Sequence, residues 1–342
     1  MRTAISPARL LVTGALLLAV VVVALLQIHS SDYLLVPDPA HPVAPLVRVQ
    51  GGREPTGPGG VYFVDVVEER ATLLQQLIPA LREDGSSLVP ADAVIPPGAN
   101  DASARRLDQQ MMANSQRFAA AVALKSAGFP VITRPIGVQV DAVAEHSGAA
   151  GKIFPGDVVK ELDGKRTFTP LQLIDAVRRH RIGDTVRVML VREGKTSSVT
   201  VKLSPAAAAG PAKRLPAIGL AAIEQSALVK LPRKVSIDAG SVGGPSAGLA
   251  FALQIASELG QNVTRGNRVA VTGALDLDGT VEPIGGVKQK TYGARAAHVD
   301  VFLVPAGDNA REARRYAHGL RIIPVRSYQQ ALRALAKLPQ KR

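Results

Sequence analysis

The chain opens with an apolar segment that is long enough to form a membrane-spanning helix. Residues 10–28, LLVTGALLLAVVVVALLQI, are almost wholly apolar, and no formal charge occurs between Arg9 and Asp32. About 20 helical residues cross the hydrocarbon core of a bilayer. Arg2 and Arg9 precede the segment, and such cations mark the cytoplasmic side. The pattern predicts that residues 1–32 form a cytoplasmic end and a single-pass anchor, and that the rest of the chain lies outside the membrane.

A cleaved signal peptide is the alternative interpretation of this segment. Signal peptides usually have apolar cores of about 7 to 15 residues, followed by a small-x-small cleavage site. This run is longer, and no convincing site follows it. We therefore favour an uncleaved anchor.

Residues 33–60 contain six prolines and several glycines, a composition typical of a stalk. We interpret residues 61–129 as an N-terminal α/β segment. Its predicted elements are a strand at 61–67, a helix at 68–82, a loop at 84–101 and a helix at 102–126. Gly128 is the expected stop signal of the second helix.

Residues 130–203 have the pattern of short strands with one helix. The predicted elements are a strand at 138–143, a PGD corner, a helix at 170–180, and a hairpin of 186–192 with 199–203. This order resembles a PDZ domain, in which a sheet edge and the neighbouring helix hold an extended peptide. A β-rich spacer is the alternative. Residues 204–217, rich in alanine and proline, are expected to be a linker.

The PDZ resemblance implies a candidate peptide site at PIGV. Its residues are Ile136, Gly137 and Val138. This loop departs from the usual glycine and aromatic pattern of the family.

Residues 218–342 contain a serine at the start of a predicted helix. SAGLAFALQIASELG has helical spacing from Ser246 to Gly260, and GSVGGP precedes it. The free N–H groups and positive dipole at a helix start can stabilise an oxyanion. Serine is also a preferred helix cap, so this motif alone favours a structural role.

The downstream motifs favour a catalytic role instead. VAVTG at 269–273, DGTVEPIGGVKQK at 278–290 and VFLVP at 301–305 follow GPSAG. In this order they resemble the proteolytic domain of Lon-family peptidases. The resemblance implies a catalytic pair of Ser246 and Lys290.

A lysine can act as the base of such a pair when it is desolvated. An amine with a pKa of about 10.4 is protonated at neutral pH, but burial lowers its pKa. Neutral Lys290 could then take the proton of Ser246. The resemblance also implies that Thr272 helps to orient the lysine. The remaining supporting residues are Gly244, Pro245 and Ala247.

Lys288 is an alternative base, because side chains two residues apart on a helix point to different faces and only one can face Ser246. The family's lysine is the second of the K-x-K pair, which favours Lys290. The sequence departs from the family at Gly243, where many Lon proteases have an acidic residue. The nearest upstream acid is Asp238.

Other hydrolase classes fit less well. GPSAG matches the G-x-S-x-G elbow of α/β-hydrolases, which needs a preceding strand and a late histidine. VSID could form the preceding strand, and His298 or His318 could be the late histidine. The alternating array of strands and helices that this fold requires is absent from the sequence. The six histidines form no HExxH motif, the chain has no cysteine, and no Walker A motif is present.

The net charge and the aromatic content of the chain indicate which classes of partner it could bind. The net charge is +13, spread along the chain, and aromatics make up only 4% of residues. Few aromatics leave little for base stacking, so we expect no nucleic-acid partner and favour an anionic membrane or envelope surface. A solvated basic face without a partner is the alternative.

Taken together, the sequence predicts an α+β protein. A Lon-type proteolytic domain at 218–342 follows a PDZ-like β-rich domain at 130–203 and an N-terminal transmembrane helix. This combination resembles the membrane-anchored, PDZ-containing Lon-like proteases of Gram-positive bacteria, the YlbL type.

The resemblance implies an ATP-independent serine endopeptidase that acts on unfolded or flexible protein segments. It would lie in the cell membrane with its N-terminus cytoplasmic and its catalytic domain extracytoplasmic. It would need no cofactor or metal, and it could form a homo-oligomeric ring. The alternative is a catalytically silent PDZ/Lon-like binding scaffold at the cell envelope.

Overall fold

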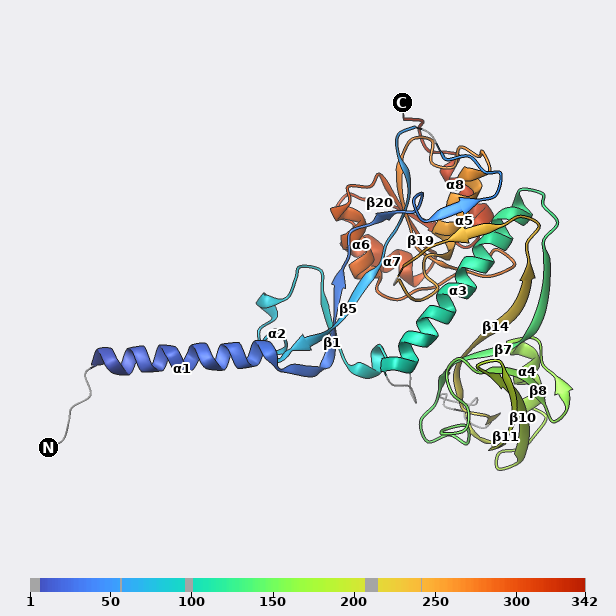
Figure 1. The fold of residues 1–342 in the computed structure, drawn as a ribbon, viewed down its shortest axis with the longest axis horizontal. Coiled ribbons are helices and arrows are strands. Elements are labelled where there is room, and N and C mark those ends of the chain that lie inside the picture. Colours follow the sequence, from blue (N-terminus) through green and yellow to red (C-terminus); the bar gives the residue numbers. More distant parts are fainter. Residues whose placement is uncertain (1–6, 56, 96–100, 207–214, 241, 342) are drawn as a thin grey trace.

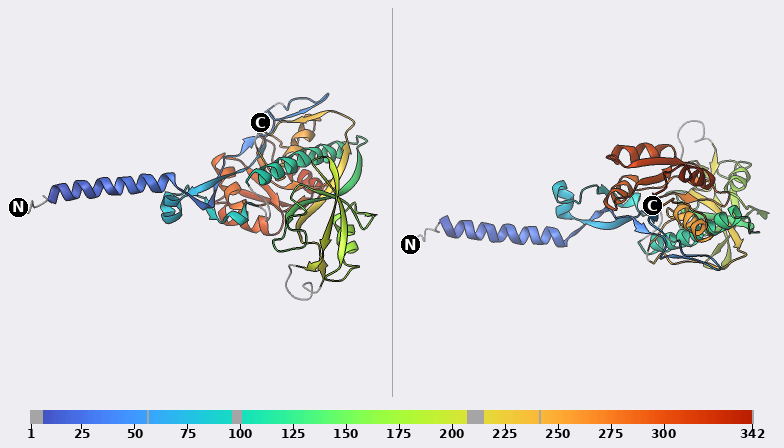
Figure 2. Two further views of the ribbon diagram at one scale, coloured as in Figure 1. Left: turned by 60° about the horizontal axis from the view of Figure 1, so that its bottom comes forward. Right: turned by 90° about the horizontal axis from the view of Figure 1, so that it is seen from above.

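The computed structural model describes residues 7–55, 57–95, 101–206, 215–240 and 242–341. One long helix, α1, projects from the rest of the molecule in all three views (Figures 1 and 2). The remainder consists of a body that contains the C-terminus and a strand-rich module beside it (Figure 1).

The helices are α1 (Pro7–Gln27), α2 (Leu73–Leu77), α3 (Asp101–Ser126), α4 (Pro170–Val177), α5 (Gly248–Glu258), α6 (Val287–Ala296), α7 (Asp308–Tyr316) and α8 (Tyr328–Leu335), with 3-10 turns η1 (Pro79–Leu81) and η2 (Ala91–Ala93). The strands before α4 are β1 (His29–Pro37), β2 (His41–Pro42), β3 (Val47–Val49), β4 (Gly60–Phe63), β5 (Val66–Thr72), β6 (Ser87–Val89), β7 (Ile132–Val143), β8 (Val158–Leu162) and β9 (Lys165–Arg166). The later strands are β10 (Thr185–Arg192), β11 (Lys195–Lys202), β12 (Ser204–Pro205), β13 (Pro216–Ala217), β14 (Leu220–Lys230), β15 (Val235–Ile237), β16 (Arg268–Val271), β17 (Ala274–Leu275), β18 (Val281–Glu282), β19 (Val301–Pro305) and β20 (Arg321–Val325).

The body is built on a five-stranded sheet with the order β2-β4-β16-β19-β20. Its four longer strands pair in parallel, and β2 pairs antiparallel with β4. All five residues of β19 are buried, as expected for a parallel strand that is covered on both faces. Leu303 packs in one core cluster with residues of α5 and α8, and Phe302 packs in another with residues of α6 and α7. Helix α5, which follows Ser246, and helix α6, which contains Lys290, therefore lie on opposite faces of this sheet.

The strand-rich module, residues 132–203, is organised around a second sheet with the order β11-β10-β8-β7-β14. Its core is a separate cluster of valines and leucines, including Val140, Val188 and Leu190. Helix α4 begins at Pro170 after Thr169, whose side chain accepts a hydrogen bond from the backbone N–H of Gln172. This module lies between two segments that belong to the body.

Helix α3 connects the body with the module (Figure 1). Its alanine-rich half, with Ala119, Ala120 and Ala123 buried, packs in the same cluster as α5. At its other half, the side-chain amides of Gln110 and Asn114 both donate to Oε1 of Gln139 on β7, each at 3.0 Å. The fully buried side chain of Gln139 thus connects the module to α3 by two hydrogen bonds.

The structure differs from the sequence-based expectation in the first hundred residues. The segment expected to be a helix at 68–82 begins as β5, which pairs with β1, and only Leu73–Leu77 are α-helical. Thr72 caps this short helix, and Pro79 follows it. The expected strand at 61–67 is divided between β4 and β5, which lie in different sheets. The sequence lacked a local signal for these pairings because the partner strands are remote.

The segment expected to be a stalk, residues 33–60, contains ordered strands. Most of β1, together with β2 and β3, lies in it, and β3 pairs with β15, which ends nine residues before Ser246. The expected linker at 204–217 contains β12 and β13, while residues 207–214 lie outside the described residues.

Helix α1 is apolar and exposed. Leu11, Leu16 and Leu17 are among its exposed side chains, and side chains of this helix are described from residue 11 onward. Within the described part of the chain, no helix combines the length and the hydropathy needed to cross a membrane.

Candidate active site

Ser246 lies at the end of a glycine-rich loop, two residues before the first residue of α5. Gly244 has a φ of +74°, a left-handed conformation that glycine adopts without steric cost. The carbonyl oxygen of Ser246 accepts hydrogen bonds from the backbone N–H of Gly273 at 2.8 Å and from the hydroxyl of Thr272 at 3.3 Å. The end of β16 therefore fixes the backbone of the serine, and the serine side chain is half-buried.

Lys290 approaches this serine from α6. Its Nζ lies 2.8 Å from Oγ of Ser246. Lys290 is only 5% exposed, and this burial lowers the pKa of its amine to about 8. The negative charges of Asp65 and Glu68 act in the opposite direction and favour the ammonium form. The lysine is therefore close to neutral at mildly alkaline pH and can accept the serine proton.

Lys288 points away from the serine. Its Nζ donates to the carbonyl oxygen of Ser86 at 2.7 Å and to Oγ of Ser87 at 3.2 Å. It also lies 5.8 Å from the centre of the Tyr316 ring. Of the two lysines, only Lys290 therefore places its amine at the hydroxyl of Ser246.

Two sequence-family matches cover most of the chain after residue 106. Residues 221–337 match the model described as the Lon protease (S16) C-terminal proteolytic domain, and residues 107–203 match the PDZ domain model. Residues 221–337 form a Lon-type proteolytic domain. This is a Ser-Lys peptidase domain, and a PDZ domain precedes it.

The chain is also similar to curated Lon proteases and to a solved PDZ domain. Lon protease 1 of Sorangium cellulosum is 41% identical over 78 residues, which are 22% of this chain and 10% of that protein. Lon protease 2 of Bacillus subtilis is 34% identical over 104 residues, which are 30% of this chain and 18% of that protein. The chain therefore spans less than a fifth of either relative. The crystal structure of the PDZ domain of an SdrC-like protein from Listeria monocytogenes is 28% identical, covers 25% of this chain and 86% of that one, and has a TM-score of 0.23.

The Lon-type domain receives a carboxyl group from outside the matched segment. Asp65 follows β4 at the break between two sheets, and its carboxylate accepts a hydrogen bond from the N–H of Val66 at 2.8 Å. Burial raises the pKa of Asp65, and the Lys290 charge lowers it. Sequence reasoning missed Asp65 and Glu68, because nothing in VYFVDVVEE indicates that this strand end lies beside a lysine more than 200 residues away.

A second carboxyl group lies beside the nucleophile loop of the Lon-type domain. A Cβ atom at Gly243 would lie only 2.8 Å from Cβ of Asp108 on α3. The N–H of Gly244 donates to the carbonyl oxygen of Asp108 at 3.0 Å, and burial raises the pKa of the Asp108 carboxyl. The sequence has glycine where many Lon proteases have an acid, and here an aspartate of another element fills the adjacent space.

The other predicted site residues have the following places. Pro245 presents its carbonyl oxygen to the hydroxyl of Ser115 on α3 at 2.9 Å, and Ala247 is the residue before α5. Thr272, which was expected to orient the lysine, donates its hydroxyl to the backbone carbonyl of Ser246 at 3.3 Å. The candidate peptide residues Ile136, Gly137 and Val138 lie on β7, far along the chain from the dyad. Gly137 and Val138 are paired with β14 of the same chain, whereas the carbonyl oxygen of Ile136 accepts a hydrogen bond from Nζ of Lys160 at 2.6 Å.

Proposed function

We propose that this protein is a serine endopeptidase that uses Ser246 as nucleophile and Lys290 as general base. The observation that carries the proposal is the 2.8 Å separation between Lys290 Nζ and Ser246 Oγ, with the amine buried and its pKa lowered to about 8. Such a pair needs no histidine, because a desolvated lysine has a pKa in the range where proton transfer is efficient.

The proposed reaction uses groups that surround the serine. Neutral Lys290 takes the proton from Ser246, and Oγ attacks the carbonyl carbon of the substrate peptide bond. The resulting ammonium group protonates the leaving amine, and Lys290 then activates the water that hydrolyses the acyl-enzyme. The N–H groups of Gly248 and Leu249 already donate to Pro245 and Gly273. We therefore assign the oxyanion to the N–H groups of Ser246 and Ala247.

We propose that the substrates are unfolded or flexible protein segments and that cleavage needs no ATP. The sequence contains no G-x-x-x-x-G-K-[ST] phosphate-binding loop, which supports hydrolysis without nucleotide-driven unfolding. The PDZ domain is proposed to recognise substrates or partners. A homo-oligomeric ring is part of the same proposal, supported by the family resemblance alone, and light scattering of the purified protein tests it.

We also propose that residues 10–28 anchor the protein in the cell membrane, with the catalytic domain outside. The support is the uncharged, apolar sequence that follows Arg9 and the exposure of apolar side chains such as Leu16 and Leu17 on α1.

Cleavage of a reduced and alkylated protein, with and without Mg-ATP, tests the enzymatic proposal. We expect Ser246→Ala and Lys290→Ala each to lose activity by on the order of 10³-fold or more. Lys288→Ala is the matched control and is expected to retain activity, because its amine binds the loop at Ser86 instead of Ser246. Cleavage that persists in both dyad variants would contradict the assignment. A full biological effect of the Ser246→Ala protein would favour the binding scaffold.

A further inference from the structure

The edge of the PDZ domain where a peptide is expected is covered by a strand of the same chain. Strand β7 is paired with β14 in an antiparallel ladder that runs from Leu220 opposite Val143 to Lys230 opposite Ile132. Within this ladder, Gly137 lies opposite Ser226 and Val138 opposite Gln225. The main chain of two of the three candidate peptide residues, Gly137 and Val138, is therefore already used in strand pairing.

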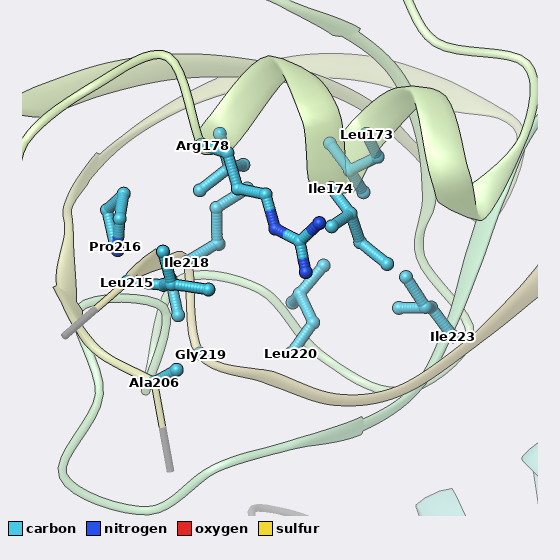
Figure 3. Close-up of a pocket in the computed structure, with 12 residues that line it drawn as sticks. Leu173, Ile174, Arg178, Ala206, Leu215, Pro216, Ile218, Gly219, Leu220 and Ile223 are labelled. Atoms are coloured by element: carbon cyan, nitrogen blue, oxygen red, sulfur yellow. The ribbon is translucent and has the colours of Figure 1, made fainter. Parts of the chain in front are cut away.

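Strand β14 and the turn before it also supply apolar side chains to the groove beside α4. Leu220 and Ile223 are half-buried and pack against the PDZ core, to which the buried Ile218 belongs. On the other side of the groove, Leu173 and Ile174 of α4 line the same pocket (Figure 3). Strand addition at a sheet edge, with side chains inserted into adjacent pockets, is the way in which such domains hold an extended peptide. Both parts of that interaction are made here by β14.

The fit of β14 is imperfect in two respects. The ladder has three register irregularities, between Leu220 and Ala222, between Ala222 and Ile223, and between Ser226 and Ala227. Such irregularities interrupt the ladder. At the third one, Ile136 has no partner on β14, and its carbonyl oxygen accepts a hydrogen bond from Nζ of Lys160 instead. Among the described residues, which exclude 207–214, a pocket of about 280 Å³ also remains between α4 and the segment that leads into β14. Unfilled apolar space lacks the contacts that close packing provides. A strand held in this way can be replaced by one that fits better.

The chemistry of the pocket indicates which occupant could compete. Its lining is mainly aliphatic, and the guanidinium of Arg178 lies among Ile174 and Leu220 (Figure 3). An extended segment with bulky apolar side chains would fill the space. Unfolded polypeptides expose such segments, whereas folded proteins bury them.

We propose that β14 is an internal ligand of the PDZ domain and that an extended apolar peptide binds to β7 only by exchange with it. The proposal deepens the recognition role that we assign to the PDZ domain under the proposed function. Exchange would free the segment after Lys230, which leads within 16 residues to Ser246. Binding by exchange does not require that Ser246 be catalytic, so the two proposals can fail separately.

A reversible covalent lock tests the exchange. The chain has no cysteine, so a pair introduced at opposed positions forms one defined disulfide. Leu228 and Arg134 are opposed on β14 and β7, and both side chains are exposed. The lock is Leu228→Cys with Arg134→Cys. The matched control is Arg187→Cys with Thr200→Cys, an opposed and exposed pair on β10 and β11 at the far side of the sheet.

The probe is a fluorescent peptide that copies residues 216–230, PAIGLAAIEQSALVK, and binding is followed by anisotropy. All proteins are full-length and carry Ser246→Ala, so that the peptide is not cut. We expect the oxidised lock to weaken binding at least tenfold and reductant to restore it, with no change in the control pair. A peptide carrying Ile223→Phe should bind more tightly than the copy, and one carrying Ile223→Asp more weakly.

A second variant tests the same exchange without a disulfide. Ile223→Asp in the protein weakens the docking of β14 and should increase the affinity for the copied peptide at least tenfold. The thermal unfolding midpoint of each variant shows whether it is folded. Equal binding to oxidised and reduced lock, or no binding to the folded Ile223→Asp protein, would overturn the proposal.

Discussion

At the scale of single residues, the site depends on the balance between burial and charge around Lys290. Burial lowers the pKa of the amine, and the carboxylates of Asp65 and Glu68 partly oppose this effect. Desolvation alone would give a weaker base, and the charges alone would keep the lysine protonated. The two effects together bring the pKa to about 8, so that a substantial neutral fraction and a useful basicity coexist.

Asp65→Asn should move the pH dependence of cleavage toward lower pH. The negative charge of Asp65 favours the ammonium form of Lys290, so its removal lowers the pKa of the lysine. The neutral base then forms at lower pH, and the ascending limb of kcat/KM moves in the same direction. Glu69→Gln is the control, because Glu69 is next to Glu68 but is not among the groups that shift the Lys290 pKa. A limb that stays in place or moves to higher pH contradicts the role of Asp65.

At the scale of elements, α3 holds the nucleophile loop from outside the catalytic sheet. Asp108 and Ser115 contact the loop at Gly244 and Pro245, and α3 packs along α5. The sequence predicts α3 well, because its helical pattern is local and continuous. It does not predict what α3 contacts, because no local pattern encodes the approach of Asp108 to a glycine 135 residues later.

Gly243→Ala should disturb the dyad without unfolding the protein. The added Cβ would lie 2.8 Å from Cβ of Asp108, and neither atom is at the end of a flexible side chain. The loop or α3 must shift, so we expect kcat/KM to fall by about tenfold or more, while the thermal midpoint changes little. The double variant with Asp108→Gly lacks the clash and should recover part of the lost kcat/KM. A glycine inside α3 should lower the free energy of unfolding by about 1 kcal/mol. Additive losses in the double variant would show that the contact does not matter.

The same distinction between local and remote signals explains which other features could be predicted from the sequence. Ser246, Lys290 and the start of α5 follow from motifs within short stretches, and the structure brings them together. The strand at residues 66–72 and the pairing of β14 with β7 depend on partners far along the chain. An isolated strand pattern does not say which edge it will cover, so these features need the folded structure.

At the scale of the whole molecule, the PDZ domain lies between two parts of the catalytic body. Strand β4 precedes it in sequence and pairs with β16, which follows it. The chain leaves the PDZ domain as β14 and reaches the nucleophile soon afterwards. Helix α1 projects from the opposite side of the body (Figure 1). The PDZ domain therefore lies on the side of the body away from α1.

Deletion of residues 1–28 tests the proposed anchor. We expect the full-length protein to remain with membranes after alkaline carbonate extraction and the shortened protein to be released, because the apolar segment supplies the hydrophobic attachment. The shortened protein should still cleave an unfolded substrate. As a control, high salt alone should not release the full-length protein, since a purely electrostatic attachment of this basic chain would be screened. Retention of the shortened protein in carbonate would contradict the anchor.

The central claim is that Lys290 activates Ser246, and the pH dependence of covalent labelling measures this directly. The rate at which a serine-directed phosphonate reacts with Ser246 can be followed by mass spectrometry from pH 5 to 10. We predict that the rate rises through about pH 8, where Lys290 becomes neutral, and that Lys290→Gln abolishes the rise and most of the labelling. Labelling that is unchanged in Lys290→Gln, or that rises near the histidine pKa of about 6.5, would contradict the account.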